Sequence, residues 1–339
     1  MGRKDRLAFS YCNVFLESYL PVQLMRSKQT VTAYVDALSL FRRFAREEKA
    51  LGIEELTLSH IDIDFLLDFR LWLTEVRKVK PQTANQRLSL VMGYLRYCSR
   101  EDVSFASTYL RLAAIPPLRC DKPDVPPLTE KAVSLILAQP PQTDKGLRDR
   151  TFMILLYELA ARVSEVVGLR LSNLMLEGSS PHIQLLGKGN KRRNIPVTGK
   201  TLDHLRRYLE VFHPEMTADR LLFYTVAKGV AGPLSLDCVD AFLKKYAAMA
   251  HGLDPDVPER IHSHQFRKGK ATHLSDKGVS LPVISRFLGH ADISTTMVYV
   301  KPNQEKIREA LLKAEGPGSP SPEQAREYEA LKARLYGLR

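Results

Sequence analysis

Apolar residues in the first third of the chain recur at steps of three and four, the spacing that places them on one face of an α-helix. Three such stripes are clear, and their members are Val31, Tyr34, Leu38, Phe41 and Phe44; Ile63, Leu66, Leu67, Phe69 and Leu73; and Leu88, Val91, Tyr94 and Leu95. The pattern predicts that residues 8 to about 113 are helical throughout and form one unit.

A proline-rich stretch interrupts this pattern at residues 115–127. So many prolines cannot continue a helix, and they favour an extended, semi-rigid connector. Helical periodicity resumes at Leu128. The longest apolar run, Phe152 to Ala161, is short and interrupted by Glu158, so it predicts a buried helix and not a membrane span.

One segment of the second half is typical of strands. The runs 182–186 and 193–197 flank the basic segment 187–191, which predicts a β-hairpin with a basic tip. After Ala314, residues 316–322 are typical of a linker, and a final amphipathic helix follows. Its features are a capping box and an apolar stripe, formed by Ser321 and Gln324 and by Ala325, Tyr328, Leu331 and Leu335.

These elements predict a mainly α fold with a small β-hairpin or sheet, an α+β protein of two domains. We expect a helical domain over residues 1–114, a linker over 115–127, a second domain over 128–315, and a linker with a tail helix over 316–339.

Charge indicates the kind of partner. Fifty Lys and Arg against 38 Asp and Glu give a net charge of +12, which favours a polyanion, with nucleic acid before an anionic membrane. No long amphipathic basic helix of the membrane-surface kind is present, and residues 1–6 lack the apolar segment of a signal peptide. Four scattered cysteines without a CxxC pair are typical of reduced thiols in a cytoplasmic protein.

Basic and hydroxyl residues precede two of the predicted helices of the first domain. Helix N-termini of this composition can bind phosphate, although a solvated cap is the commoner meaning of such a cluster. The candidates for DNA contact in this domain are Lys28, Thr30, Lys80, Gln82, Thr83 and Arg87.

Candidate chemistry lies in the second half, in pieces that are weak when taken alone. Arg162 and Glu165 share a helical face, as in a surface ion pair. Lys188 at a hairpin tip is typical of a solvated turn. His264 and Arg267 share the face of another helix, where Ser263 is the expected N-cap.

Two cations at the positive end of a helix are poor partners for its dipole, which indicates that an anion approaches there. Residues 280–282 are expected to open a short helix that closes at Gly289, and His290 follows. Tyr299 taken alone is typical of a core residue with a bonded hydroxyl.

In this order the pieces resemble the tyrosine recombinase family, which includes phage integrases and Xer-type recombinases. Residues 162–169 are similar to its first arginine box, 187–192 to its hairpin-lysine segment, and 264–267 to its second box. Residues 288–290 and Tyr299 are similar to its third box and nucleophile, with His290 and the tyrosine nine residues apart. Five boxes in order are highly specific.

The resemblance covers Leu128 to about Ile307, and residues 30–95 are similar to the family's helical core-binding domain. Departures are small: Phe266 replaces a common Leu, and Lys268 stands where many members have a second His. Neither change touches the catalytic set.

The resemblance implies a catalytic set of Arg162, Lys188, His264, Arg267, His290 and Tyr299, with Glu165 orienting Arg162 or His264 from behind. Tyr299 would attack a DNA phosphate and form a 3′-phosphotyrosyl link. The arginine forks would stabilise the transition state, and Lys188 would protonate the departing 5′ oxygen. The covalent link conserves bond energy, so no metal, ATP or other cofactor is expected.

The resemblance also implies a C-shaped clamp on double-stranded DNA, with inverted half-sites, a homo-tetramer on two sites and a Holliday junction. Integration, excision or dimer resolution in a bacterial or archaeal nucleoid would be the outcome. Further DNA contacts are expected from Lys191, Arg192 and Lys268, and the tail helix is expected to dock on its own catalytic domain or on a neighbouring protomer.

Two alternatives remain at this point. A type IB topoisomerase shares the chemistry but needs only one protomer, and a catalytically silent DNA-binding protein would share only the fold. The intact set from Arg162 to Tyr299 favours an enzyme, and the tail helix with the two-domain organisation favours a recombinase.

Overall fold

The structure is a computed structural model that describes residues 5–120, 126–187, 192–197, 199–215, 217–227, 229–290, 292, 294–297 and 322–335. Contacts divide the chain after Asp124 into two compact units, residues 1–124 and 125–339.

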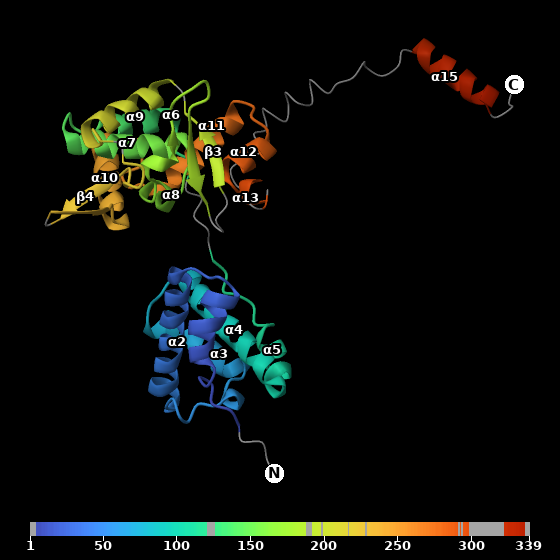
Figure 1. The fold of residues 1–339 in the computed structure, drawn as a ribbon. Coiled ribbons are helices and arrows are strands. Elements are labelled where there is room, and N and C mark those ends of the chain that lie inside the picture. The colour runs from blue at the N-terminus through green and yellow to red at the C-terminus, as the bar shows by residue number, and fades with distance from the viewer. Residues whose placement is uncertain are drawn as a thin grey trace. The chain divides into compact units, whose positions relative to one another are not determined.

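The first unit is a helical bundle (Figure 1), and its described elements are α1 (Cys12–Val14), η1 (Phe15–Gln23), α2 (Lys28–Lys49), η2 (Leu58–His60), α3 (Ile63–Leu71), η3 (Trp72–Val76), α4 (Pro81–Glu101), η4 (Val103–Phe105) and α5 (Ala106–Leu112). Ser27 caps α2 by accepting a hydrogen bond from the backbone N–H of Thr30 at 3.3 Å. Pro81 occupies the first position of α4, where no intrahelical N–H is needed.

The three predicted apolar stripes face the core of this unit. Phe41, Phe44 and Phe69 are each at most 1% exposed and pack edge to face or tilted against one another, with ring centroids 5.0–5.4 Å apart for the pairs with Phe69. Rings in such arrangements add specific stabilisation to the burial of their area. The stripes therefore gave the correct faces of α2, α3 and α4.

The expectation of helix throughout residues 8–113 was wrong between α2 and η2. Ala50 adopts a left-handed conformation with φ 54° and ends α2. The chain then runs back to the N-terminus, where Leu7 and Thr57 form an isolated β-bridge and the N–H of Ala8 donates to the carbonyl of Leu56 at 2.8 Å. A loop whose backbone groups form hydrogen bonds with a distant segment leaves no periodic pattern in the sequence.

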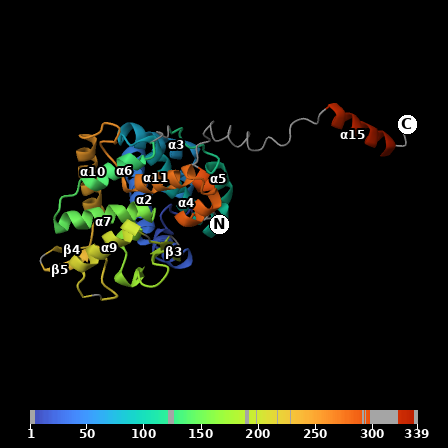
Figure 2. The ribbon, with the colours of Figure 1, turned by 90° about the horizontal axis from the view of Figure 1, so that it is seen from above.

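The second unit is also mainly helical, with two small antiparallel sheets (Figures 1 and 2), and its described elements are α6 (Glu130–Ala138), α7 (Asp144–Glu158), α8 (Val163–Val167), η5 (Leu171–Asn173), β1 (Leu174–Met175), β2 (His182–Leu186), β3 (Arg192–Pro196), α9 (Gly199–Phe212), β4 (Tyr224–Ala227), β5 (Val230–Pro233), α10 (Leu236–His251), α11 (Ser263–Asp276), α12 (Leu281–Leu288), α13 (Ser294–Met297) and α15 (Pro322–Leu335). Buried α7 packs against α9 and α11.

The predicted hairpin is present as β2 and β3, with Leu186 opposite Arg192 and His182 opposite Pro196. Side chains alternate across the sheet, so Arg193 and Ile195 share the inward face and Arg192 lies on the exposed face. Arg193 is paired with Leu185, which is fully buried. The sequence missed β1 and the separate hairpin of β4 and β5, because these strands are short and only weakly alternating.

Candidate active site

Arg162 and Glu165 form the first part of the site, at the start of α8. Ala160 has φ 42°, a left-handed conformation that turns the chain between α7 and α8. Glu165 accepts from the backbone N–H of Arg162 at 2.7 Å and from its Nη1 at 3.0 Å. The Glu165 side chain is only 4% exposed, whereas Arg162 is 37% exposed. The interpretation as a solvated surface pair was therefore wrong for Glu165.

A second guanidinium, which the sequence motifs did not single out, shares the same carboxylate. Nη1 and Nη2 of Arg193 donate to Oε1 and Oε2 of Glu165 at 2.9 and 2.7 Å, a bidentate ion pair. Desolvation of Glu165 is outweighed by the hydrogen bonds and charges of Arg193 and Arg162, which lower the pKa of this carboxyl. Glu165 is thus ionised at neutral pH although it is buried.

Arg267 lies on α11 and is fully buried. Its Nη1 donates to the carbonyl of Ala160 and its Nη2 to the carbonyl of Leu288, each at 2.7 Å. The guanidinium therefore links α11 to the turn before Arg162 and to the end of α12. Arg267 therefore has a structural role, in addition to the catalytic role that the resemblance implies.

The helix that carries Arg267 begins one residue earlier than expected. His262, and not Ser263, is the N-cap of α11, and its backbone N–H donates to Oε1 of Gln265 at 2.8 Å. Gln265 at the third helical position can close this contact, whereas Ser263 lies within the helix. His264 lies in the first turn and Arg267 directly after it, and the two still share a face.

His290 lies directly after α12, which begins after Ser280 and ends at Gly289 as predicted, with Gly289 in the left-handed region at φ 68°. The His290 ring is oriented by Thr296, whose hydroxyl lies 2.8 Å from Nδ1. Desolvation and then the positive charges of Arg267 and Arg162 lower the pKa of His290 to about 4, with smaller contributions from His264 and Arg193. His290 is therefore neutral at pH 7.

His264 is exposed on the first turn of α11. Partial desolvation of its ring, followed by the charges of Arg267, Arg162 and Lys268, lowers its pKa also. The two histidines and three arginines thus act on one another electrostatically, which places segments 162–165, 193, 264–267 and 290 in one region. The structure thus brings together Arg162, Glu165, His264, Arg267 and His290 of the predicted set, with Arg193 in addition.

Three predicted site residues, Lys188, Lys191 and Tyr299, lie outside the described residues. Arg192 is exposed and Lys268 is half-buried. In the N-terminal unit, Lys28, Lys80 and Gln82 are exposed at the starts of α2 and α4, and the remaining candidates, Thr30, Thr83 and Arg87, are half-buried.

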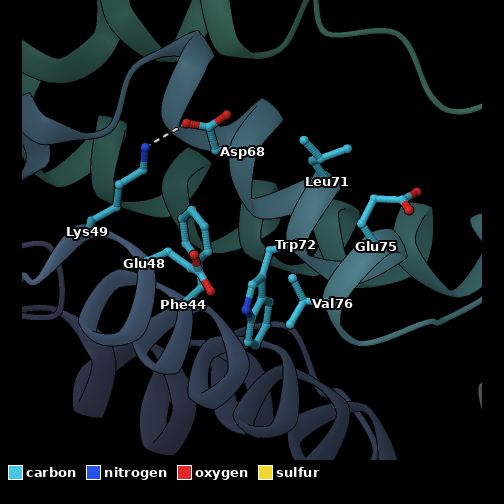
Figure 3. Close-up of a pocket in the computed structure, with 8 residues that line it drawn as sticks. All are labelled: Phe44, Glu48, Lys49, Asp68, Leu71, Trp72, Glu75 and Val76. Atoms are coloured by element: carbon cyan, nitrogen blue, oxygen red, sulfur yellow. Dashed lines mark hydrogen bonds and ion pairs between the residues drawn. The ribbon is translucent and has the colours of Figure 1, made fainter.

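A surface pocket of the N-terminal unit is lined by none of these residues (Figure 3). Its volume is about 260 Å³, and its lining is Phe44, Glu48, Lys49, Asp68, Leu71, Trp72, Glu75 and Val76. Lys49 pairs with Asp68 at 2.6 Å, which leaves Glu48 and Glu75 as the further charges of the lining. Carboxylates repel phosphate, so this pocket is an unfavourable place for DNA backbone.

Within the described ranges, no three His, Cys, Asp or Glu side chains are grouped so that they could hold a metal ion. Nor does any described helix have the length and apolar character needed to cross a membrane.

Comparison with known proteins shows the family of the chain. Residues 127–306, more than half of the chain, match the phage integrase family, and residues 15–102 match the N-terminal SAM-like domain of phage integrases. The chain therefore belongs to the phage integrase family.

Its relatives define the activity more closely. It is 32% identical over 252 residues to the tyrosine recombinase XerD of Xanthomonas campestris, a match that covers 71% of this chain and 74% of the relative. It is 27% identical over 310 residues to XerC of Staphylococcus carnosus, which covers 89% and 97%. The protein is a site-specific tyrosine recombinase, an enzyme that cuts and rejoins DNA.

Solved structures share the fold at low identity. XerH in its post-cleavage complex with a palindromic difH substrate has a TM-score of 0.64 and 20% identity, over 85% of this chain and 80% of that one. The Tn1549 transposon integrase with transposon right end DNA has a TM-score of 0.63 and 14% identity, over 86% and 95%.

Proposed function

We propose that this recombinase cuts DNA through Tyr299, with the scissile phosphate held by Arg162 and Arg267. The observation that carries this proposal is the shared region of Arg162, Arg193, Arg267, His264 and His290, in which desolvation and then the positive charges lower the pKa of both histidines. Such a concentration of positive charge in a partly buried place favours an anion. A phosphodiester in a pentacoordinate transition state is that anion.

Each remaining group has a part in this chemistry. His264, neutral at neutral pH, can accept the Tyr299 proton as its oxygen bonds to phosphorus. His290 adds a hydrogen bond to the phosphate. The bond from phosphorus to the 5′ oxygen breaks, Lys188 supplies the proton to that oxygen, and a 3′-phosphotyrosyl link remains. A partner strand's 5′-hydroxyl then reverses the step, so that neither metal nor ATP is consumed.

For the whole molecule, we propose the two-domain division 1–114, 115–127, 128–315 and 316–339. Lys28, Thr30, Lys80, Gln82, Thr83 and Arg87 would contact DNA from the first domain and Lys191, Arg192 and Lys268 from the second. Four copies on two duplex sites with inverted half-sites would exchange strands through a Holliday junction, for integration, excision or dimer resolution in the cytoplasm.

The tail helix supports assembly of this kind. Tyr328 and Leu331 of α15 are 64% and 60% exposed, and an isolated helix of this length is marginal in water. We propose that this face docks on a neighbouring protomer.

A nicked duplex tests the proposed chemistry. A binding site is first selected from a random duplex pool, and a nick near the cut position then lets the cleaved end diffuse away. We expect a denaturation-resistant protein–DNA adduct that forms equally with or without EDTA, and at least ~10² times more slowly for Arg162→Ala. An adduct that requires Mg²⁺, or one that Arg162→Ala forms at the wild-type rate, would contradict the proposal.

A further inference from the structure

Among the described residues of this region, Arg193 is a guanidinium that the sequence motifs did not mark. It shares the inward face of β3 with Ile195, and its side chain is 11% exposed. A solvated hairpin arginine would lie on the face of Arg192 instead. The strand register thus aims Arg193 at the protein interior, where its charge needs a partner.

The partner is Glu165, and the contact is shared with Arg162. Oε1 of Glu165 accepts from Nη1 of Arg162 and Nη1 of Arg193, while Oε2 accepts from the backbone N–H of Arg162 and Nη2 of Arg193. These four hydrogen bonds hold the buried Glu165 carboxylate in one orientation. Arg162 is the more exposed of the two arginines, so it is the one that faces an incoming phosphate.

The other side of Arg193 meets the turn before His290. A Cβ atom built at Gly289 would lie 3.2 Å from Cδ and 3.3 Å from Nη1 of Arg193, closer than ordinary van der Waals contact. Glycine therefore leaves the space that the arginine side chain occupies. Through these contacts Arg193 joins the hairpin to the segments of Arg162 and His290.

We propose that Arg193 is a positioning residue, which holds the Glu165 carboxylate so that Glu165 in turn keeps the Arg162 guanidinium aligned for the scissile phosphate. This inference rests on the proposed role of Arg162. It also connects the strand next to the Lys188 segment to Arg162 through the shared Glu165 carboxylate, so that a displacement of the hairpin would change the position of Arg162.

Loss of Arg193 has a consequence that depends on pH. Glu165 is 4% exposed and would keep only Arg162 as a cationic partner, so desolvation would raise its pKa from the present lowered value. Once protonated, Glu165 no longer forms an ion pair with Arg162. The defect of such a variant therefore grows as pH falls and shrinks as pH rises.

Other titratable groups face this region. They are His264 on α11 and His290 after α12, with Arg267 and Arg162 as fixed charges. Because the histidines titrate in the wild-type enzyme also, the informative quantity is the ratio of variant to wild-type rates at each pH.

The test compares Arg193→Gln and Arg193→Lys, each in the wild-type and in the Glu165→Gln background. Single-turnover cleavage of the nicked duplex is measured at saturating protein from pH 6 to pH 9, and half-site affinity is measured by gel shift. Arg220→Gln is the matched control, since Arg220 is exposed, stacks on Tyr224 at 4.7 Å and lies outside the site.

We expect Arg193→Gln to slow cleavage about 10- to 100-fold, as does removal of the outer partners that orient metal ligands, with half-site affinity changed less than about 3-fold. The loss should deepen towards pH 6, and Arg193→Lys should lose less than Arg193→Gln, because it keeps a positive charge beside Glu165. In the Glu165→Gln background the same substitution should cost less than about 3-fold at every pH, because the effect passes through the carboxylate.

An equal loss in both backgrounds would overturn the inference, since Arg193 would then act without Glu165. So would a loss that lies wholly in half-site affinity, which would make Arg193 a DNA contact. If Arg193→Gln does not fold, Arg193→Lys decides, with an expected loss of about 3- to 10-fold that disappears in Glu165→Gln. Absence of any adduct from the wild-type enzyme would instead reject the proposed chemistry.

Discussion

Arg267 is expected to be the most costly of the site residues to replace, because it has two functions. In Arg267→Met, the carbonyl oxygens of Ala160 and Leu288 each lose a donor at 2.7 Å in a fully buried place. A buried acceptor left without its partner costs about 1–3 kcal/mol, so the variant should lose about 2–6 kcal/mol of unfolding free energy. Arg267→Lys can keep one of the two contacts and should lose about 1–3 kcal/mol.

The assay uses the position of the single tryptophan. Trp72 is the only tryptophan of the chain and lies in the N-terminal unit. The urea midpoint reported by its fluorescence is therefore an internal control, which should be the same in the variants and the wild-type protein. Circular dichroism reports both units, and its transition for the catalytic unit should move to lower urea. Cleavage is then measured at a temperature where all variants are folded.

We expect both Arg267 variants to cleave at least ~10² times more slowly, even when fully folded, because the fork that stabilises the transition state is gone. The reasoning is refuted if Arg267→Met unfolds within about 1 kcal/mol of the wild-type protein and cleaves within tenfold of its rate.

Further predictions concern the neighbouring elements. His290→Asn should flatten the loss of stability between pH 6.5 and pH 4. Because the pKa of His290 in the folded protein is about 4, the native state binds fewer protons than the unfolded state in this pH range, so the unfolding free energy falls as pH falls. Screening of the half-buried ring reduces this loss to about 1–2 kcal/mol. If the urea midpoint of His290→Asn changes with pH as the wild-type midpoint does, the lowered pKa of His290 is rejected. Gly289→Ala should lower the unfolding free energy by about 1–2 kcal/mol, because of the φ of 68° and the contact with Arg193. Gly289→Asn should lower it by less, because Asn tolerates this φ. Equal losses in the two variants would mean that φ is not the cause. Truncation after Ala314 should leave binding to single half-sites intact and weaken cooperative binding to paired half-sites in gel shifts, and unchanged cooperativity would rule out docking in trans.

Much of the fold could be predicted because local signals and tertiary packing agree. The stripe of Phe41 and Phe44 faces the core of the first unit, and Gly289 ends α12 where the sequence indicated. Ser27 and Pro81 mark helix starts through capping chemistry that acts within a single turn. Such features need no knowledge of distant partners.

The missed features depend on partners far away in the sequence. Arg193 follows other basic residues and was passed over, although the alternation of β3 with Ile195 inward was a signal that it faces the interior. Its bond to Glu165 spans 28 positions, and no spacing rule connects them. In the same way, the predicted helix is a loop between α2 and η2, where Thr57 pairs with the distant Leu7.

The identity of the nucleophile is the central claim that can be tested most directly. The adduct formed on a nicked duplex is digested with trypsin, and the peptide that carries the nucleotide is sequenced by mass spectrometry. We predict that the nucleotide is linked through a 3′-phosphate to Tyr299 alone, and that Tyr299→Phe forms no adduct while it binds the site with nearly unchanged affinity. A nucleotide linked to any other residue, or an adduct formed by Tyr299→Phe, would contradict the proposed mechanism.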